Sequence, residues 1–434
     1  MNLTNLKKAF ADHGCQKLFV KRLSPNDNSK NQVYLGGSFD ILNIFPISAI
    51  TNESAGDWER ERFKAALNFA WIDSEGSLFP APKAQLVLYP KYPEVRFSGF
   101  LAGCQNPPSE LMAVRLAYRL LFFGVSNTGV IIGFVAAPDS EISNEFDSII
   151  PEEELGVFKI INLSPIVNNR EKLLNELLRI HNCDWIVSKR LDKFSNILPC
   201  KSPNCGGYTL EAELGITPNG YSEPDYLGWE IKQFGVTNFE NINSRVITLM
   251  TPEPTHGYYV DQGVEAFIRK YGYDDHNGRA DRMNFGGIHK FGFTHPTTKL
   301  TLNLTGFNQD TGTIRNTDGR ISLVDKAGME AASWSFSSLL LHWNRKHNQA
   351  CYVPSMLNKN EPIRYKYGDK VILGIGTDFY LFLRQMAAGN IYYDPGIKLE
   401  NVSTHPTAKR RSQFRIKSQH LSDLYKVSEV VNLV

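Results

Sequence analysis

The sequence has few cysteines and no long apolar stretch, and both features limit the classes of protein to which it can belong. Only six of the 434 residues are cysteine, at irregular spacing, which excludes a disulfide-stapled secreted scaffold. "CKSPNC", residues 200–205, resembles half a zinc site, but no second close pair or His pair completes it, so we expect free, reduced thiols. No run approaches the roughly 18 apolar residues that cross a bilayer, and the start lacks a signal-peptide core. We therefore expect a cytoplasmic protein without a membrane partner.

The chain also has almost no excess of either charge and no nucleotide-binding motif. Its 47 Lys and Arg stand against 45 Asp and Glu, so any nucleic-acid surface must come from where the charges lie. "GIGTDF" (374–379) lacks the third glycine of a dinucleotide fingerprint, and no G-x-x-x-x-G-K-[ST] occurs. "HWNRKHN" (342–348) could suggest an HNH-like nuclease, but it continues an amphipathic helix without a ββα-metal context. We therefore expect no nucleotide cofactor.

The chain does contain enough apolar residues for two domains. Its composition is 42% hydrophobic and 12% aromatic, which is typical of globular structure with real cores. The best boundary follows the turn formers Ser164-Pro165, because leucines then recur at helical spacing from residue 173 to 178. We expect one domain over residues 1–165 and a second over residues 166–434.

Residues 1–165 have the pattern of a strand-rich domain. Short β-branched and aromatic runs, such as "QVYLGGSF" and "AQLVLYP", alternate with turn residues. The apolar period predicts a helix over "SELMAVRLAYRLLFFG" (109–124), and "GVIIGFVAA" (129–137) predicts a buried strand. A small β-barrel with a few helices fits this pattern.

Residues 166–434 have a mixed α/β pattern. Helices are predicted at "YTLEAELG" (208–215), "GVEAFIRKYG" (263–272) and "SWSFSSLLLHWNRKH" (333–347). A strand is predicted at "GWEIKQFG" (228–235), and a β-meander over residues 286–325.

A short acidic segment carries the clearest chemical signal. In "EPDYLGWEIK" (223–232), Glu230 and Lys232 lie two apart on an expected strand and so share one face. Asp225 follows a proline, and the Tyr-Leu-Gly turn can return its carboxylate to Glu230. Two close carboxylates repel unless a cation neutralises them, and such oxygen ligands suit Mg²⁺. Glu211 on the preceding helix is a further carboxylate; a surface strand with a plain Glu–Lys pair is the alternative.

These residues resemble a known nuclease signature. "TLEAELGI" followed by "EPDYLGWEIK" is similar to the L-E-x-x-L-G…P-D-(F/Y)-x-x-(I/L/W)-E-(I/L)-K arrangement of MutH-like PD-(D/E)XK nucleases, a group that includes the MvaI/BcnI restriction endonucleases. The similarity continues through "ITLMTPEPT", "FIRKYG", "WSFSSL" and "QFRIKSQHLSDLYKV", over most of residues 170–434. It implies an α/β nuclease in which Glu211, Asp225, Glu230 and Lys232 are catalytic and the three carboxylates bind Mg²⁺.

The C-terminal 39 residues are basic, with seven Lys or Arg against three acids. "STHPTAKRRSQFR" is typical of a loop that enters a DNA groove, where Arg or His can read guanine edges. A solvated basic face is the plain alternative. Because this region supplies base recognition in MvaI-like enzymes, the resemblance implies DNA contacts by Asp394, His405, Arg411 and Arg415.

The N-terminal residues carry a second, shorter resemblance. "LFVKRLSPNDNSKNQVYLGGSFDILNIFP" is similar to the opening of the EcoRII effector domain, a DNA-binding pseudobarrel of the plant B3 type. "AQLVLYPKYPEVRFSGF" could supply the second arm of such a barrel. The two segments mix donors and acceptors, as base reading requires, although S-P-N-D is also an ordinary turn. The implied DNA-binding residues are Arg22, Asn26, Asp27, Gln32, Lys91, Glu94 and Arg96.

Together the two resemblances imply a type II (IIE-like) restriction endonuclease. It would use Mg²⁺ to cut double-stranded DNA at CCWGG, and its N-terminal domain would bind a second copy of the site as effector. We expect a monomer that works with a cognate methyltransferase. Two alternatives stay open: a non-cleaving, sequence-specific DNA-binding regulator, and a repair-type strand nickase.

Overall fold

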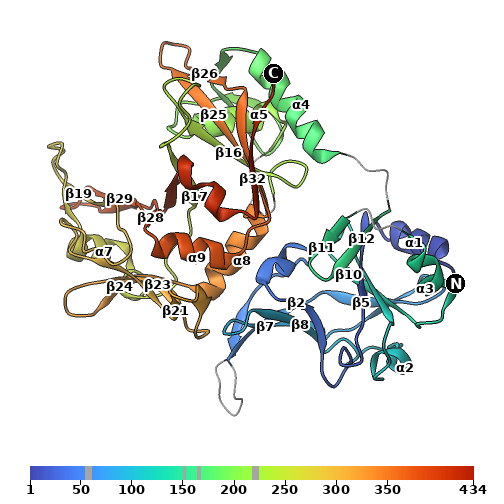
Figure 1. The fold of residues 1–434 in the computed structure, drawn as a ribbon. Helices are drawn as coiled ribbons and strands as arrows, with labels where there is room; N and C mark the ends of the chain where they lie inside the picture. The colour runs from blue at the N-terminus through green and yellow to red at the C-terminus, as the bar shows by residue number, and fades with distance from the viewer. Residues whose placement is uncertain (54–60, 150–152, 164–167, 218–223) are drawn as a thin grey trace. The chain divides into compact units, whose positions relative to one another are not determined.

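The computed structural model describes residues 1–53, 61–149, 153–163, 168–217 and 224–434. The chain forms two compact units, Met1–Val167 and Asn168–Val434 (Figure 1). None of the helices in these ranges combines the length and the apolar character that crossing a membrane requires. The turn expected at Ser164-Pro165 lies outside the described residues.

In its described part, the N-terminal unit is built on two sheets. The first contains β1 (Lys17–Arg22), β5 (Phe69–Ile72), β6 (Leu78–Pro80), β9 (Leu120–Val125), β10 (Ile131–Ala136), β11 (Glu153–Leu155) and β12 (Phe158–Asn162). The second contains β2 (Val33–Gly36), β3 (Thr51–Glu53), β4 (Arg62–Ala66), β7 (Gln85–Tyr89) and β8 (Glu94–Ser98). The helices are α1 (Leu3–Asp12), η1 (Phe39–Asn43), α2 (Ser109–Met112) and α3 (Glu141–Asp147). The strand orders are β11-β12-β1-β9-β10-β5-β6 and β2-β8-β7-β4-β3.

Phenylalanine side chains join the two sheets into one core. Phe97 on β8 meets Phe69 on β5 and Phe123 on β9, with ring centroids 5.0 and 5.4 Å apart in edge-on geometry. Buried residues of α1, such as Leu6 and Phe10, pack on the first sheet. Neither sheet closes on itself within the described residues, so the structure gives open sheets and does not show the expected barrel.

The helix predicted over residues 109–124 is wrong. Only Ser109–Met112 is helical, and Leu120–Val125 forms β9 in the middle of the first sheet. β9 is hydrogen-bonded to β1 on one side and to β10 on the other, and residues 120–124 are buried. A short apolar run fits a buried strand as well as a helix, and tertiary pairing decides between them.

The C-terminal unit contains an α/β sheet with parallel pairing at its centre. Its strands are β13 (Ile186–Val187), β16 (Glu230–Gly235), β25 (Gln349–Asn358), β26 (Arg364–Tyr367), β27 (Lys370–Ile375) and β32 (Val427–Asn432). The order is β13-β26-β25-β27-β32, and β16 pairs with β25 in parallel. The helices are α4 (Asn169–Asn182), α5 (Cys205–Glu213), α6 (Tyr258–Asp261), α7 (Gly263–Tyr271), α8 (Phe336–His347), α9 (Phe379–Ala387), η2 (Ser418–His420) and η3 (Ser422–Leu424). The predicted strand and the three predicted helices of this part are confirmed as β16, α5, α7 and α8.

A hydrophobic core fixes β16 beside α4 and α5. Leu173 and Leu177 of α4 and Leu210 of α5 are buried in one cluster with Ile231 of β16 and Cys351 of β25. Helices α4 and α5 therefore both pack on the apolar face of β16. This packing leaves the alternate positions of the strand, which carry charge, on the other face.

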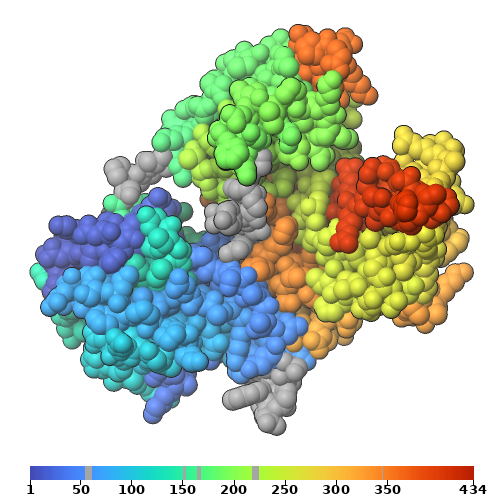
Figure 2. Space-filling view, turned by 180° about the vertical axis from the view of Figure 1, so that it is seen from behind, coloured from blue at the N-terminus to red at the C-terminus, as the bar shows by residue number. Residues whose placement is uncertain are grey.

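Small sheets form the rest of the unit. Their strands are β14 (Lys189–Leu191), β15 (Ile197–Pro199), β17 (Val246–Met250), β18 (Tyr273–Asp274), β19 (Arg282–Gly286), β20 (Thr301–Thr305), β21 (Phe307–Asn308), β22 (Thr313–Ile314), β23 (Arg320–Val324), β24 (Glu330–Ser335), β28 (Ile391–Tyr393), β29 (Gly396–Glu400), β30 (Thr407–Lys409) and β31 (Phe414–Lys417). The predicted meander is correct only in part, because β20-β23-β24 form one sheet while β19 joins β18, β29 and β30. Figure 2 shows the red C-terminal segment against the yellow segment that contains β19.

Candidate active site

The acidic strand begins directly after the turn expected from the sequence. Tyr226 and Trp229 exchange backbone hydrogen bonds of 2.9 and 2.8 Å, and the two residues between them have positive φ. Such a turn reverses the chain, and Asp225 returns beside the strand. There its Oδ2 accepts a hydrogen bond from the Ile231 backbone N–H at 3.0 Å. Glu230, the residue before Ile231, is buried.

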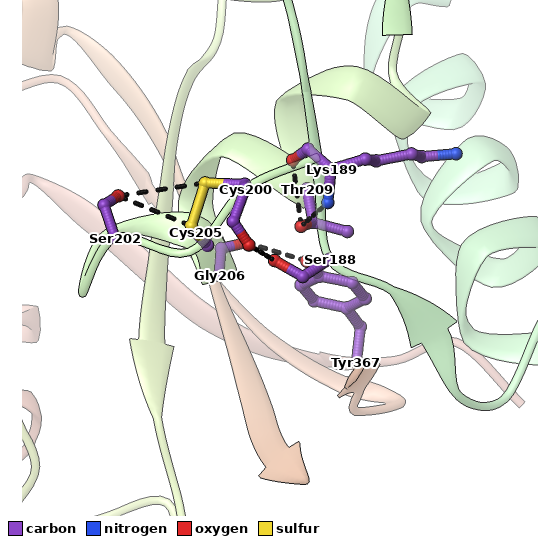
Figure 3. Close-up of a disulfide and its surroundings, with 8 residues drawn as sticks. All are labelled: Ser188, Lys189, Cys200, Ser202, Cys205, Gly206, Thr209 and Tyr367. Carbon is purple, nitrogen blue, oxygen red and sulfur yellow. Dashed lines mark hydrogen bonds between the residues drawn. A yellow bond between two sulfur atoms is a disulfide. The ribbon is translucent and has the colours of Figure 1, made fainter. Parts of the chain in front are cut away.

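A disulfide fixes the start of the helix that carries Glu211. Cys200 and Cys205, the first residue of α5, are joined with their Cα atoms 5.7 Å apart (Figure 3). The expectation that all six cysteines are free is therefore wrong for these two, because the first turn of α5 brings them within bridging distance. Tyr367 Oη also donates to the Gly206 carbonyl at 2.7 Å. The helix start is thus held by a covalent bond and by a hydrogen bond from β26.

The four predicted catalytic side chains are coupled electrostatically. Burial, and then the Asp225 charge, raise the pKa of Glu211 to about 7. Burial, and then the Glu230 charge, raise the pKa of Asp225 to about 6. Burial by itself would lower the pKa of Lys232, but the surrounding carboxylates, Glu230 above all, raise it. Near neutral pH the Glu211 carboxyl group, and to a smaller extent that of Asp225, therefore retains part of its protons, and a bound cation would favour their release.

The two oxygens of the Glu230 carboxylate have different surroundings. Its Oε1 accepts from Lys232 Nζ at 2.6 Å, whereas its buried Oε2 has no partner among the described residues. A buried carboxylate oxygen without a hydrogen-bond partner costs free energy of folding. In the same ranges, no three His, Cys, Asp or Glu side chains form a complete metal cage. Mg²⁺ commonly binds one or two carboxylates together with water and substrate phosphates, so Glu230 and Asp225 fit this cation.

The helix α8 adds two side chains that sequence reasoning missed. Lys346 Nζ lies 3.9 Å from Glu230 Oε1. His342, one turn earlier, faces the same charges: burial first, then Lys346 and Lys232, lower its pKa. Both residues belong to the segment "HWNRKHN". The charged residues of this segment were the feature of the sequence that could have indicated a role in the site. Their approach to β16 depends on the packing of α8 against β25 and could not be read from spacing.

A family model describes this part of the chain. The model of the MvaI/BcnI restriction endonuclease family matches residues 174–425, which is more than half of the sequence. The chain belongs to the MvaI/BcnI restriction endonuclease family. The match spans β16, α5 and α8, and it includes all the side chains of the candidate site.

Two solved structures of restriction endonuclease MvaI align with the chain, and each covers 62% of this chain and 100% of its own. The complex with a cognate DNA substrate aligns with 17% identity and a TM-score of 0.46. The structure in the absence of DNA aligns with 16% identity and a TM-score of 0.34. No curated protein sequence gives a significant match.

In this family member, two of the predicted base-reading residues meet on the sheet β17-β31-β28. Arg415 Nη1 donates to Asp394 Oδ2 at 2.6 Å, and Arg415 Nε donates to Thr248 Oγ1 at 3.2 Å. Arg411 and His405 are exposed, and neither side chain has a hydrogen bond or ion pair within the described ranges. The structure therefore brings Asp394 and Arg415 together and leaves Arg411 and His405 on the surface.

The N-terminal unit contains a polar cavity of about 610 Å³. It is lined by Lys21, Ser24, Asn26, Asp27, Asn31, Gln32, Tyr34, Arg96 and Arg115. Four of the seven predicted effector residues are in this set. Of the other three, Arg22 pairs with Asp147, Glu94 pairs with Arg96 at 3.1 Å, and Lys91 lies over the Tyr92 ring.

The cavity rests on a buried ionic network. Asp27, 5% exposed, accepts from Lys21 Nζ at 2.5 Å and from the Tyr34 backbone N–H at 2.9 Å. Below it, Arg119 is fully buried and donates to four backbone carbonyls, including that of Asp27 at 2.9 Å. The carboxylate oxygens of Asp27 thus accept hydrogen bonds from within the unit, and these bonds stabilise the fold. Sequence reasoning missed Lys21 and Arg115, the latter because residues 109–124 were taken for one helix.

Proposed function

We propose that the protein is a Mg²⁺-dependent type II restriction endonuclease that cuts double-stranded DNA at CCWGG. The observation that carries this proposal is the Glu230 carboxylate, with one oxygen on Lys232 and the other buried without a hydrogen-bond partner among the described residues. Asp225 and Glu230 would hold the cation, with Glu211 as a further ligand. When bound, the cation supplies positive charge against the charge that develops on the phosphate.

The side chains of the chain then divide the remaining work. The Ile231 N–H fixes the orientation of the Asp225 carboxylate. Lys232 is held on the same face as Glu230, and from there it can orient the attacking water and stabilise the charged phosphorane-like state. Water adds to phosphorus, the 3′ oxygen leaves, and the product carries a 5′-phosphate. We expect one active site per chain and a monomer, so a duplex is cut by two successive nicks.

Sequence reading is assigned to the basic C-terminal region. Arg415 is anchored by Asp394 and Thr248, which limits its rotamers and leaves less entropy to lose on binding. An arginine fixed in this way suits a guanine edge. His405 and Arg411, both exposed, would add groove and phosphate contacts.

The N-terminal unit is proposed as an EcoRII-like effector domain of the B3 type. Asn26, Gln32, Arg96 and the exposed Arg115 supply donors around one cavity, which suits phosphates and base edges. Binding of one CCWGG copy there would tether the nuclease near a second copy and raise its effective concentration. A cognate methyltransferase would protect the host DNA.

Plasmid digestion tests the nuclease. With Mg²⁺, wild-type protein should convert a CCWGG plasmid to linear DNA, and Lys232→Met should bind the site with unchanged Kd but cut it at least about 10²-fold more slowly. Lys366→Met, which breaks an ion pair with Asp184 elsewhere in the unit, is the matched control and should cut normally. Nicked circles alone would indicate a strand nickase, and specific binding without scission would indicate a regulator.

Addition of a CCWGG oligonucleotide duplex tests the effector. On a plasmid with one site, the duplex should accelerate cleavage by wild-type protein, and a scrambled duplex should not. Asn26→Ala should reduce this response without changing the basal rate. If the wild-type rate is the same with both duplexes, the effector role is refuted.

A further inference from the structure

The Glu230 carboxylate is approached by two lysines from different elements. Lys232, on the same strand, lies 2.6 Å from Oε1, and Lys346, on α8, lies 3.9 Å from that same oxygen. The Glu230 side chain is 2% exposed and each lysine side chain 23% exposed. Both ammonium groups therefore lie near Oε1, whereas Oε2 has no hydrogen-bond partner in the described part of the chain.

A single lysine is enough for an ion pair, so the second requires an explanation. Two ammonium groups at one oxygen repel each other, and this repulsion is offset only where further negative charge lies near. Lys346 interacts with Glu211 and Asp225 as well, and it favours the ionised form of both. A position in the last turn of α8 would also suit a lysine, but this does not explain its approach to a buried carboxylate.

The charge balance of the site with a bound cation and DNA provides a reason for the second lysine. Three ionised carboxylates are balanced by a divalent cation and one lysine. A phosphodiester then adds one uncompensated negative charge. With Lys346 in place, the complete set of side chains, cation and phosphodiester is neutral.

One of the three N–H donors of Lys232 is directed to Glu230 Oε1. When its Nζ moves away from Glu230 to centre on a water or a phosphate oxygen, Oε1 loses its only hydrogen-bond donor among the described residues. Lys346 is the cation already placed on the same oxygen.

We propose that Lys346 is a positioning residue that holds Glu230 Oε1 while Lys232 turns to the scissile phosphate. The proposal rests on the nuclease function proposed above. It makes the contribution of Lys346 depend on the presence of Lys232, and a purely structural lysine would show no such dependence.

The test compares full-length Lys346→Met, Lys346→Arg and the control Lys366→Met. Methionine keeps the apolar stem of lysine and removes the charge. Under single-turnover conditions with saturating Mg²⁺, Lys346→Met should cut a CCWGG duplex about 10²-fold more slowly, with the Kd for the duplex in Ca²⁺ changed less than about threefold. Lys346→Arg should recover most of the rate, and Lys366→Met should match wild type.

Two further readouts separate positioning from structure. Calorimetric titration of DNA-free protein with Ca²⁺ should show equal or tighter binding for Lys346→Met, because a repelling cation is removed. In the Lys232→Met background, the added Lys346→Met change should slow cleavage less than about threefold.

Several results would overturn the proposal. They are a wild-type cleavage rate for Lys346→Met, the full loss repeated in the Lys232→Met background, or weaker Ca²⁺ binding together with a lower Tm. If the wild-type protein itself binds CCWGG but does not cut it, the proposed function fails and takes this role with it. If wild type cuts and only the Lys346 variants behave otherwise than expected, the nuclease assignment is unaffected.

Discussion

Replacement of Glu211 by glutamine should stabilise the metal-free protein while it removes one of the proposed ligands of the cation. Burial, together with the Asp225 charge, raises the pKa of Glu211 from 4.5 to about 7. Because this folded pKa lies above the unfolded value, the ionised carboxylate destabilises the native state. The destabilisation is absent below about pH 4.5, grows as the pH rises, and is complete above about pH 7.

The size of the effect follows from the shift. A rise of about 2.5 pKa units corresponds to at most about 3 kcal/mol, and solvent screening of the partly exposed side chain reduces this to about 1–2 kcal/mol. In a unit of this size, that free energy is worth about 2–8 °C in Tm. We therefore expect Glu211→Gln to melt a few degrees above wild type at about pH 8 in EDTA, with most of the difference lost at about pH 5.

Glu213→Gln is the matched control, because Glu213 lies on the same helix but pairs with cations. Its Oε1 is 2.5 Å from Lys189 Nζ, so this variant should melt below wild type at about pH 8. The measurement is thermal unfolding followed by circular dichroism, at both pH values, with and without Ca²⁺. A Glu211→Gln variant that is no more stable than wild type at about pH 8, or equally shifted at both pH values, would refute the reasoning.

Three further perturbations test other parts of the structure. Reduction of the Cys200–Cys205 disulfide, which closes a short loop, should cost about 2 kcal/mol by the loop-entropy relation and lower the Tm measured with dithiothreitol. Arg119→Met removes the buried guanidinium that donates to four backbone carbonyls and should destabilise the N-terminal unit by about 3 kcal/mol or more in urea denaturation. Asp394→Asn releases Arg415 from its charged partner and should reduce the ratio of cleavage at CCWGG to cleavage at one-base variants by about tenfold.

Each of these has its own control. Dithiothreitol should not change the Tm of a Cys200→Ser/Cys205→Ser double variant. Arg115→Met, at an exposed arginine of the same unit, should unfold at the urea concentration of wild type. Asp423→Asn, at a surface carboxylate that pairs with His420, should keep the cleavage ratio. Equal effects in a variant and its control would contradict the corresponding assignment.

The sequence by itself determined those features that neighbouring residues fix. The period of two in a strand puts Glu230 and Lys232 on one face, and a tight turn returns Asp225 to the start of that strand; both follow from local backbone geometry. The helices α5 and α8 are likewise predicted from the local sequence, although α5 begins at Cys205, three residues before the predicted start. For this reason the candidate catalytic segment could be predicted before any fold was known.

Only the tertiary structure decided which residues contact the segment around Glu230 and which apolar runs pair as strands. The stretch Leu120–Val125 suits a helix or a buried strand, and its place between β1 and β10 made it a strand. Lys346 lies far along the chain from Glu230, and it reaches that carboxylate because α8 packs on the strand beside β16. Such contacts depend on how the whole core fills space, and local spacing carries no information about that.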